Sequence, residues 1–226
     1  MEPTRAPRVK ICCISSVAEA RMAIAAGASA LGLVSEMPSG PGVISEATIA
    51  EIAATVPPPI GTFLLTSKQD VDSIVAQQRR CRTNCIQLCD SLTSGTASEL
   101  KSALPGVSIV QVVHVTGPES VDEACTVAGS VDAILLDSGN PALKIKELGG
   151  TGRRHNWSLS REIRERVSVP IFLAGGLNEN NVAEAIETVA PFGLDLCSGV
   201  RTDGKLDEGK LGRFFGAVRR ACVTEV

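Results

Sequence analysis

Four side chains able to move protons or act as nucleophiles stand in or at the ends of short apolar runs. Cys12 lies in the first run, His114 ends the fifth, Asp137 closes the sixth and Asp195 lies in the eighth. Partial burial favours the protonated form of a carboxyl group, which suits a general acid. We therefore predict acid–base chemistry centred on Asp137. The structural alternatives are a capping role for Asp137, core packing for Cys12 and a rim hydrogen bond for His114.

Cys12 is the candidate base, because a thiolate that faces a polar mouth can accept a proton. Cys13 follows it directly. Side chains alternate between the two faces of a strand, so we expect only one of these two thiols to point into the mouth.

Two glycine-bearing segments follow the last two apolar runs. They read IFLAGGLNENN (171–181) and LDLCSGVRTDG (194–204). Glycine allows a backbone to approach a phosphate closely, and amides at helix N-termini bind anions. We predict a phosphate site built from Gly175, Gly176, Ser198 and Gly199, with bare turns as the alternative.

Strand-like and helix-like segments alternate eight times along the chain. The expected strands are Val9–Ile14, Ala30–Val34, Ile60–Leu65, Cys85–Leu88, Ser108–His114, Ala133–Leu136, Pro170–Leu173 and Gly193–Leu196. The expected helices are Val17–Ala26, Glu46–Ala54, Lys68–Gln78, Ala97–Leu104, Ser120–Ala128, Ser158–Val167, Glu179–Val189 and Glu208–Cys222. This pattern predicts an α/β protein, a single (β/α)8 TIM barrel over residues 1–226. A doubly wound open sheet is the alternative, although no GxGxxG motif follows the first strand.

Two segments rich in turn-forming residues follow predicted strands. They are Met37–Val43 and Ser138–Asn156. In a barrel of this kind both would lie at the mouth formed by the carboxyl ends of the strands, where active sites are built. Long loops inside a compact domain are usually functional.

Composition excludes several classes of protein. The 226 residues are 44% hydrophobic and 21% charged, and the formal net charge is −3. A disordered chain would be less apolar, and a nucleic-acid-binding protein would usually be basic. Aromatic residues make up only 3%, too few for stacking on bases. No apolar run is long enough to span a membrane, so we expect a small-molecule partner rather than nucleic acid or a membrane.

Eight cysteines occur, most of them inside apolar runs. Buried cysteine behaves as a small hydrophobic residue, so we interpret the chain as reduced and cytoplasmic. The N-terminus also lacks the apolar stretch of a secretory signal. A zinc site is the alternative, but Cys81, Cys85 and Cys89 lack a second closing pair and only two histidines occur. We expect neither a metal nor a cofactor.

Seven segments together resemble the phosphoribosylanthranilate isomerase family of tryptophan biosynthesis, in order and in spacing. They are VKICCIS (9–15), GASALGLV (27–34), QL (87–88), ILLDS (134–138), GGTGRRHNW (149–157), LAGGLNENNVAEAI (173–186) and DLCSGV (195–200). The resemblance covers nearly the whole chain. It implies a (β/α)8 isomerase that converts an N-phosphoribosyl arylamine into a 1-amino-1-deoxyribulose phosphate, an aldose–ketose (Amadori) rearrangement without cofactors.

The resemblance also implies roles for particular residues. Cys12 falls on the family's catalytic base and Asp137 on its acid. The family's phosphate-binding segments fall on Gly175, Gly176, Ser198 and Gly199. The loop over the site includes Gly150, Thr151 and Gly152, and the substrate-binding set is completed by Asp195 and Arg201.

The chain departs from the family pattern at several positions. Cys13 replaces a glycine, Cys89 replaces a histidine, and Gly42 stands near the position of an arginine that binds the anthranilate carboxylate. Arg201 replaces a glutamate and could supply a cation instead. Three interpretations therefore stay open: this isomerase, a related enzyme acting on another phosphorylated sugar, or a barrel that only binds such a ligand. The sequence does not fix the oligomeric state.

Overall fold

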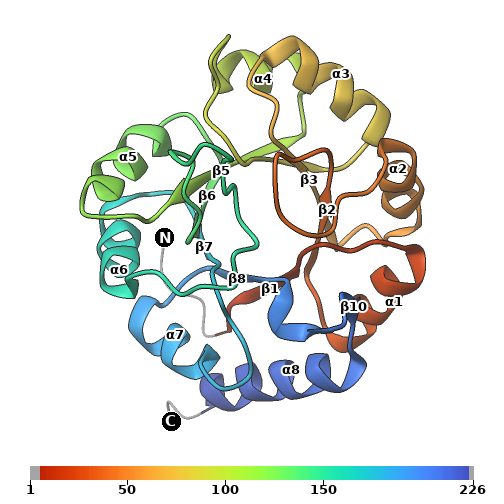
Figure 1. Ribbon diagram of the computed structural model, residues 1–226, viewed down its shortest axis with the longest axis vertical. Coiled ribbons are helices and arrows are strands. Elements are labelled where there is room, and N and C mark those ends of the chain that lie inside the picture. Colours follow the sequence, from red (N-terminus) through yellow and green to blue (C-terminus); the bar gives the residue numbers. More distant parts are fainter. Residues whose placement is uncertain (1–5, 224–226) are drawn as a thin grey trace.

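A closed barrel of eight parallel strands forms the centre of the molecule. The computed structural model describes residues 6–223, so residues 1–5 and 224–226 of the expected domain lie outside the described residues. The strands hydrogen-bond in chain order, and the eighth pairs with the first. Figure 1 looks along the barrel and shows the helices as a ring around the strands. The predicted (β/α)8 fold is confirmed, and the open-sheet alternative is wrong.

The eight barrel strands fall where the alternating pattern predicts them. They are β1 (Arg8–Ile11), β2 (Ala30–Val34), β3 (Gly61–Thr66), β4 (Cys85–Leu88), β5 (Ser108–His114), β6 (Ala133–Asp137), β7 (Ile171–Leu173) and β8 (Gly193–Leu196). A 3-10 turn, η1 (Ser198–Val200), and the short strands β9 (Arg201–Thr202) and β10 (Lys205–Leu206) follow β8.

A helix follows each barrel strand within the described range. The helices are α1 (Val17–Ala26), α2 (Glu46–Thr55), α3 (Val71–Cys81), α4 (Ala97–Ala103), α5 (Glu119–Ala128), α6 (Trp157–Arg166), α7 (Val182–Val189) and α8 (Glu208–Val223). In residues 6–223, none of them combines the length and the apolar character needed to span a bilayer.

Alternation along each strand divides the core into two layers. In β3, Phe63 and Leu65 face the barrel interior, whereas Leu64 packs against the helices. In β6, Leu135 faces inward and Leu136 outward in the same way. Both faces of every strand are thus buried, which explains the nearly continuous apolar runs in the sequence.

Local capping sets where several helices begin. The side chains of Ser16, Ser45 and Asp70 each accept a hydrogen bond from the backbone amide three residues further on. Thr96 and Glu99 cap α4 reciprocally. Such caps satisfy amides that have no partner inside the helix, so each helix begins at a defined residue after its loop.

Two element boundaries differ from the sequence prediction in ways that affect the mouth of the barrel. Strand β1 ends at Ile11 rather than Ile14, because Cys13 adopts a left-handed backbone conformation with φ +61°. Helix α3 begins only at Val71, after its N-cap Asp70, so Lys68 lies in the loop instead of the helix.

The loops after β2 and β6 meet above the mouth. The hydroxyl of Ser39 donates a hydrogen bond of 2.6 Å to the carbonyl oxygen of Lys146. A Cβ atom added at Gly40 would lie 3.6 Å from the carbonyl oxygen of Gly149, so the two loops run in van der Waals contact. Together they cover the carboxyl ends of the strands on one side.

Candidate active site

A cavity opens at the carboxyl ends of the barrel strands. Side chains from β2, β3, β4, β6 and β8 reach it, together with the segments that follow β1, β2, β4, β6, β7 and β8. Of the residues predicted for the site, it brings together Cys12, Asp137, Gly150, Thr151, Gly152, Gly175, Gly176, Asp195 and Ser198. Gly199, Arg201 and His114 are not among its lining residues.

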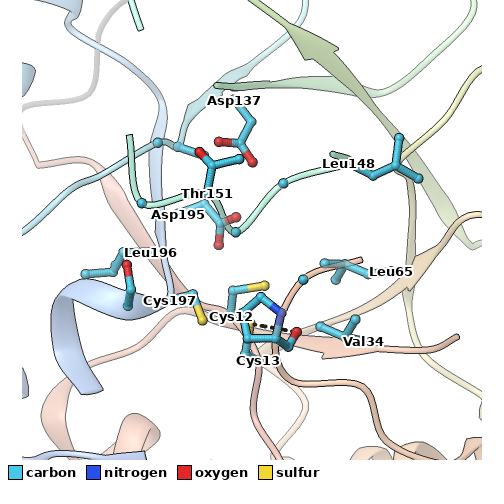
Figure 2. Close-up of a pocket in the computed structure, with 18 of the residues that line it drawn as sticks. Cys12, Cys13, Val34, Leu65, Asp137, Leu148, Thr151, Asp195, Leu196 and Cys197 are labelled. Carbon is cyan, nitrogen blue, oxygen red and sulfur yellow. Dashed lines mark hydrogen bonds between the residues drawn. The ribbon is translucent and has the colours of Figure 1, made fainter. Parts of the chain in front are cut away.

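Cys12 and Asp137 approach the cavity from different strands. The amide of Cys12 donates to the carbonyl of Leu196 at 2.9 Å, which holds Cys12 against β8 just beyond the end of β1. Asp137 is the last residue of β6, on another side of the barrel. Figure 2 shows the Asp137 carboxyl and the Cys12 thiol on opposite sides of the cavity, with Asp195 between them. A ligand bound there would have an acid on one side and a thiol on the other.

The loop after β6 fixes the Asp137 carboxyl. Its Oδ1 accepts a hydrogen bond of 2.7 Å from the amide of Ser138. A Cβ atom added at Gly149 would lie 2.7 Å from Oδ2, so the backbone there passes directly beside the carboxyl group. The Ser138 hydroxyl also hydrogen-bonds that of Thr151 at 2.7 Å. The loop therefore shields Asp137 on one side and leaves it open toward the cavity.

Both Cys12 and Cys13 line the cavity, so the prediction that only one thiol would face it is wrong. The left-handed φ of Cys13 interrupts strand alternation and turns its side chain toward the same side as that of Cys12. Contacts with the thiols of Cys12 and Cys197, together with burial, hold the pKa of Cys13 well above its ordinary value. Cys13 therefore keeps its proton, and Cys12 is the better candidate for the base.

Three loops meet at the glycine-rich end of the cavity. A Cβ atom added at Gly176, after β7, would lie 2.8 Å from the carbonyl oxygen of Gly152 in the loop after β6. One added at Gly199, after β8, would lie only 2.0 Å from the carbonyl oxygen of Leu177. Any side chain there would push the loops apart. Gly199 therefore contributes by allowing this packing, while Ser198 lines the cavity itself.

A buried ion pair that we did not predict lies beneath the cavity. The ammonium of Lys10 donates to Oδ1 of Asp195 at 2.9 Å, and the Lys10 side chain is 0% exposed. Burial opposes the charge on Lys10, but the charge and hydrogen bond of Asp195, together with the nearby thiols of Cys12 and Cys89, raise the lysine pKa above its ordinary value. A charged residue inside each of two apolar strands was the available signal. Asp195 thus lines the cavity and also joins β8 to β1.

Arg201 does not supply a cation to the cavity. Its guanidinium donates to Glu19 at 2.9 Å, to the carbonyl oxygen of Cys13 at 2.5 Å and to that of Gly204 at 3.0 Å. These bonds anchor the segment after β1 to α1 and to the β9–β10 hairpin. The arginine therefore supports the unusual conformation of Cys13 from outside the cavity.

Several further lining residues were not predicted for the site, among them Gln87, Cys89 and Leu148. Gln87 lies in β4, Cys89 directly follows the end of that strand, and the buried Leu148 comes from the loop after β6. Within residues 6–223, the buried Oε1 atom of Gln87 has no hydrogen-bond partner, so it remains available to accept one from a ligand. A glutamine inside an apolar strand, which also belongs to the QL motif of the family resemblance, was the signal for Gln87 in the sequence.

His114 lies in the barrel wall. One of its ring nitrogens, Nε2, is 3.3 Å from the carbonyl oxygen of Cys89. This is the rim hydrogen bond that we considered as the alternative to catalysis. Among the described residues, no three His, Cys, Asp or Glu side chains are placed to hold one metal ion together.

The closed barrel, with a cavity at its mouth that holds an acid and a thiol, defines a (β/α)8-barrel enzyme. The model of the N-(5'-phosphoribosyl)anthranilate (PRA) isomerase family matches residues 9–217. This protein therefore belongs to the N-(5'-phosphoribosyl)anthranilate isomerase family, as the sequence motifs indicated. Membership favours the first of the three interpretations of the sequence.

Relatives with this name resemble the chain over almost its whole length. The N-(5'-phosphoribosyl)anthranilate isomerase of Methanocella arvoryzae is 32% identical over 92% of this chain and 95% of its own. That of Halorubrum lacusprofundi is 35% identical over 94% and 97%.

Solved structures of proteins with this name have the same fold as this chain. The phosphoribosyl anthranilate isomerase of Thermotoga maritima superposes with a TM-score of 0.77 at 28% identity, over 95% of this chain and 99% of its own. Another isomerase of this name was solved in complex with reduced 1-(o-carboxyphenylamino)-1-deoxyribulose 5-phosphate. It has a TM-score of 0.75 and 26% identity, over 95% of this chain and 99% of its own.

Proposed function

We propose that this protein isomerises N-(5'-phosphoribosyl)anthranilate to the 1-deoxyribulose 5-phosphate derivative, with Asp137 as general acid and Cys12 as general base. The observation that carries the proposal is their placement on opposite sides of one cavity. A group bound between them can receive a proton on one side and lose a proton on the other, as this rearrangement requires.

The reaction needs a proton donated to the ring oxygen, a proton removed from C2, and a final tautomerisation. Asp137 gives its proton to the ring oxygen of the ribose, and the C1–O bond breaks to leave an open-chain iminium ion on the anthranilate nitrogen. The Cys12 thiolate then removes the proton from C2, and that electron pair forms the C1–C2 double bond of an enamine. The resulting enol then tautomerises to the ketone: the hydroxyl group on C2 loses its proton, and C1 gains one. Each such proton transfer by a positioned side chain contributes about 10²–10⁴-fold.

The glycine-rich end is the proposed phosphate site. Backbone amides in the loops after β7 and β8 and the hydroxyl of Ser198 are the donors available there, and such groups favour phosphate oxygens. We place Gly175, Gly176 and Gly152 around the phosphate, and Gly199 behind them. The free Oε1 atom of Gln87 is the proposed acceptor for a ribose hydroxyl.

The working environment follows from the chemistry. The substrate is a phosphorylated small molecule, and both steps need only a carboxyl group and a thiol. A thiol base must stay reduced, so we infer that the protein acts in the cytoplasm. A strain that lacks its own isomerase of this kind and requires tryptophan should grow without it when this gene is supplied.

The direct test is turnover of freshly prepared N-(5'-phosphoribosyl)anthranilate by the purified protein, followed by the loss of its fluorescence. We expect Asp137→Asn and Cys12→Ser each to lower kcat by at least about a hundredfold, because each removes one proton-transfer group. Cys85→Ser is the matched control, since Cys85 begins β4 and does not line the cavity.

Two outcomes would contradict the proposal. A folded wild-type protein without turnover would exclude the activity. Variants at Asp137 and Cys12 that keep the wild-type rate would exclude these residues as acid and base. Circular dichroism of each variant separates a loss of chemistry from a loss of fold.

A further inference from the structure

The cavity has an apolar end opposite its glycine-rich end. Figure 2 shows Val34, Leu65 and Leu148 on the side away from Leu196 and Cys197. These three side chains are buried, at 4–6% exposure. An aromatic ring fits such a surface, because burying it against aliphatic side chains is favourable.

A carboxylate on that ring would find no cation inside the cavity. Among the described residues that line it, none is a lysine or an arginine. Lys10 is fully buried on Asp195, and Arg201 is engaged by Glu19. Removing a carboxylate from water without a partner is costly, so a ligand that carries one needs a cation at the edge of the cavity.

A second hollow adjoins the apolar end and contains lysines. It shares Met37 and Leu148 with the main cavity. Its charged lining residues are Lys68, Lys146, Glu36 and Asp90. The order across the mouth is therefore glycine loops, Asp137 with Cys12, an apolar wall, and then ammonium groups. This order matches a molecule with a phosphate at one end and a carboxylated ring at the other.

Lys146 is the better placed of the two lysines. It lies two residues before Leu148, and its carbonyl is tied to Ser39 of the facing loop. Its ammonium donates to Asp90, whose side chain is only 10% exposed, while the Lys146 side chain is 39% exposed. An ammonium has three donors, so Asp90 can hold Lys146 in place while another donor faces a ligand.

Lys68 comes from a different loop. It lies in the loop between β3 and α3, and no residue of that loop lines the main cavity. Lys146 instead comes from the loop that also shields Asp137 and carries Leu148 into the cavity.

Resting on the proposed function, we propose that Lys146 binds the carboxylate of the substrate's aryl group and thereby selects a carboxylated arylamine. The ring lies against Val34, Leu65 and Leu148, and Asp90 positions the ammonium. The loop after β6 thus recognises the substrate as well as shielding Asp137.

The test compares two ligands by calorimetry. One is reduced 1-(o-carboxyphenylamino)-1-deoxyribulose 5-phosphate, and the other is the same compound without the carboxyl group. We expect Lys146→Gln to weaken binding of the first about tenfold and to leave the second unchanged, because only the first loses a charge-assisted hydrogen bond. Lys146→Arg should retain most of the affinity, since it keeps the charge.

Lys144→Gln is the matched control. Lys144 is exposed on the same loop and lines neither hollow, so we expect it to change neither affinity. With substrate, Lys146→Gln should raise KM about tenfold while kcat stays within about twofold, as expected for a residue that binds without taking part in the chemistry.

Three results would overturn the proposal. In the first, Lys146→Gln weakens both ligands equally or neither of them. In the second, Lys68→Gln produces the carboxyl-dependent loss instead. In the third, the wild-type protein binds neither ligand, which contradicts the proposed function as well. Because binding is measured without turnover, failure of the Lys146 assignment alone is distinguishable from failure of the isomerase assignment.

Discussion

At the scale of single residues, burial decides which titratable groups keep their charge near the site. His155 packs against the glycine loop: a Cβ atom added at Gly175 would lie 3.0 Å from its Nδ1. Its Nε2 lies 2.7 Å from the hydroxyl of Ser160. Burial lowers the pKa of His155 to about 4, although the charge of Asp137 acts in the opposite direction. The folded protein therefore holds a neutral imidazole at neutral pH.

This residue predicts a pH dependence of stability. A histidine in the unfolded chain has a pKa of about 6.5. Between that pH and about pH 4, His155 is therefore protonated in the unfolded chain but neutral in the folded one. The free energy of unfolding should fall as the pH drops from about 6.5 toward 4. We expect His155→Gln to reduce the stability loss between pH 7.5 and pH 5 by about 2 kcal/mol, measured by urea unfolding. An unchanged difference between the two pH values would contradict it.

At the scale of elements, the segment after β1 and the loop after β2 fit each other closely. Cys13 adopts φ +61°, and a Cβ atom added at Gly42 would lie 2.5 Å from the Cβ atom of Cys13. The two departures from the family pattern are thus in contact. Because residue 13 has a side chain, residue 42 must be a glycine: side chains at both positions would occupy the same space.

Because of this contact, we expect the effects of Gly42→Ala and Cys13→Gly on the free energy of unfolding to be non-additive. We expect Gly42→Ala to cost about 2 kcal/mol, partly from its φ of +83° and partly from the clash with Cys13. In a Cys13→Gly background the clash with the Cβ atom is gone, so the cost should fall by about 1 kcal/mol. Urea unfolding of the four proteins measures this coupling.

Gly40→Ala provides the matched control for that cycle. Gly40 has a φ of +102°, but the nearest atom to an added Cβ is the carbonyl oxygen of Gly149 at 3.6 Å. Gly40→Ala should therefore lower the free energy of unfolding through backbone strain alone, and its effect should be additive with that of Cys13→Gly. Equal coupling for Gly40 and Gly42 would show that the contact with Cys13 is not the cause.

At the scale of the whole molecule, stability depends on closing the barrel between its first and last strands. Lys10 of β1 and Asp195 of β8 pair in register at this seam, and their side chains form the buried ion pair. Breaking such a pair leaves an uncompensated charge in the interior, which costs about 3–5 kcal/mol.

Asp195→Asn should therefore lower the free energy of unfolding by about 3 kcal/mol in urea titrations. The double variant Lys10→Met with Asp195→Leu should recover most of that loss, because neither charge remains. Lys101→Met is the control: it removes an exposed pair with Asp132 of 2.8 Å, which is worth under about 1 kcal/mol. A single variant as stable as the wild type would show that the seam does not depend on the pair.

Much of the fold and part of the site were predictable from the sequence, for a common reason. Strands buried on both faces produce uninterrupted apolar runs, and capping residues such as Ser45 and Asp70 mark helix starts locally. Asp137 could be placed at the mouth because a strand of known direction ends there. Cys12 was placed by position and by the family resemblance.

The remaining features depend on contacts between segments far apart in the chain. The conformation of Cys13 is stabilised by Arg201, nearly two hundred residues away, and it overrides strand alternation. The same bonds withdraw Arg201 from the cavity where a cation was expected.

The sequence by itself determined the order of elements, the closed barrel and the family, because these follow from local patterns and from motifs in a fixed order. Tertiary structure alone decided which side chains share the cavity, the pairing of Lys10 with Asp195, and the position of Lys146 beside the apolar end. The physical reason is that a barrel brings eight separate loops to one mouth. Residues that come into contact there are far apart in the chain, at no regular spacing from which the contact could be predicted.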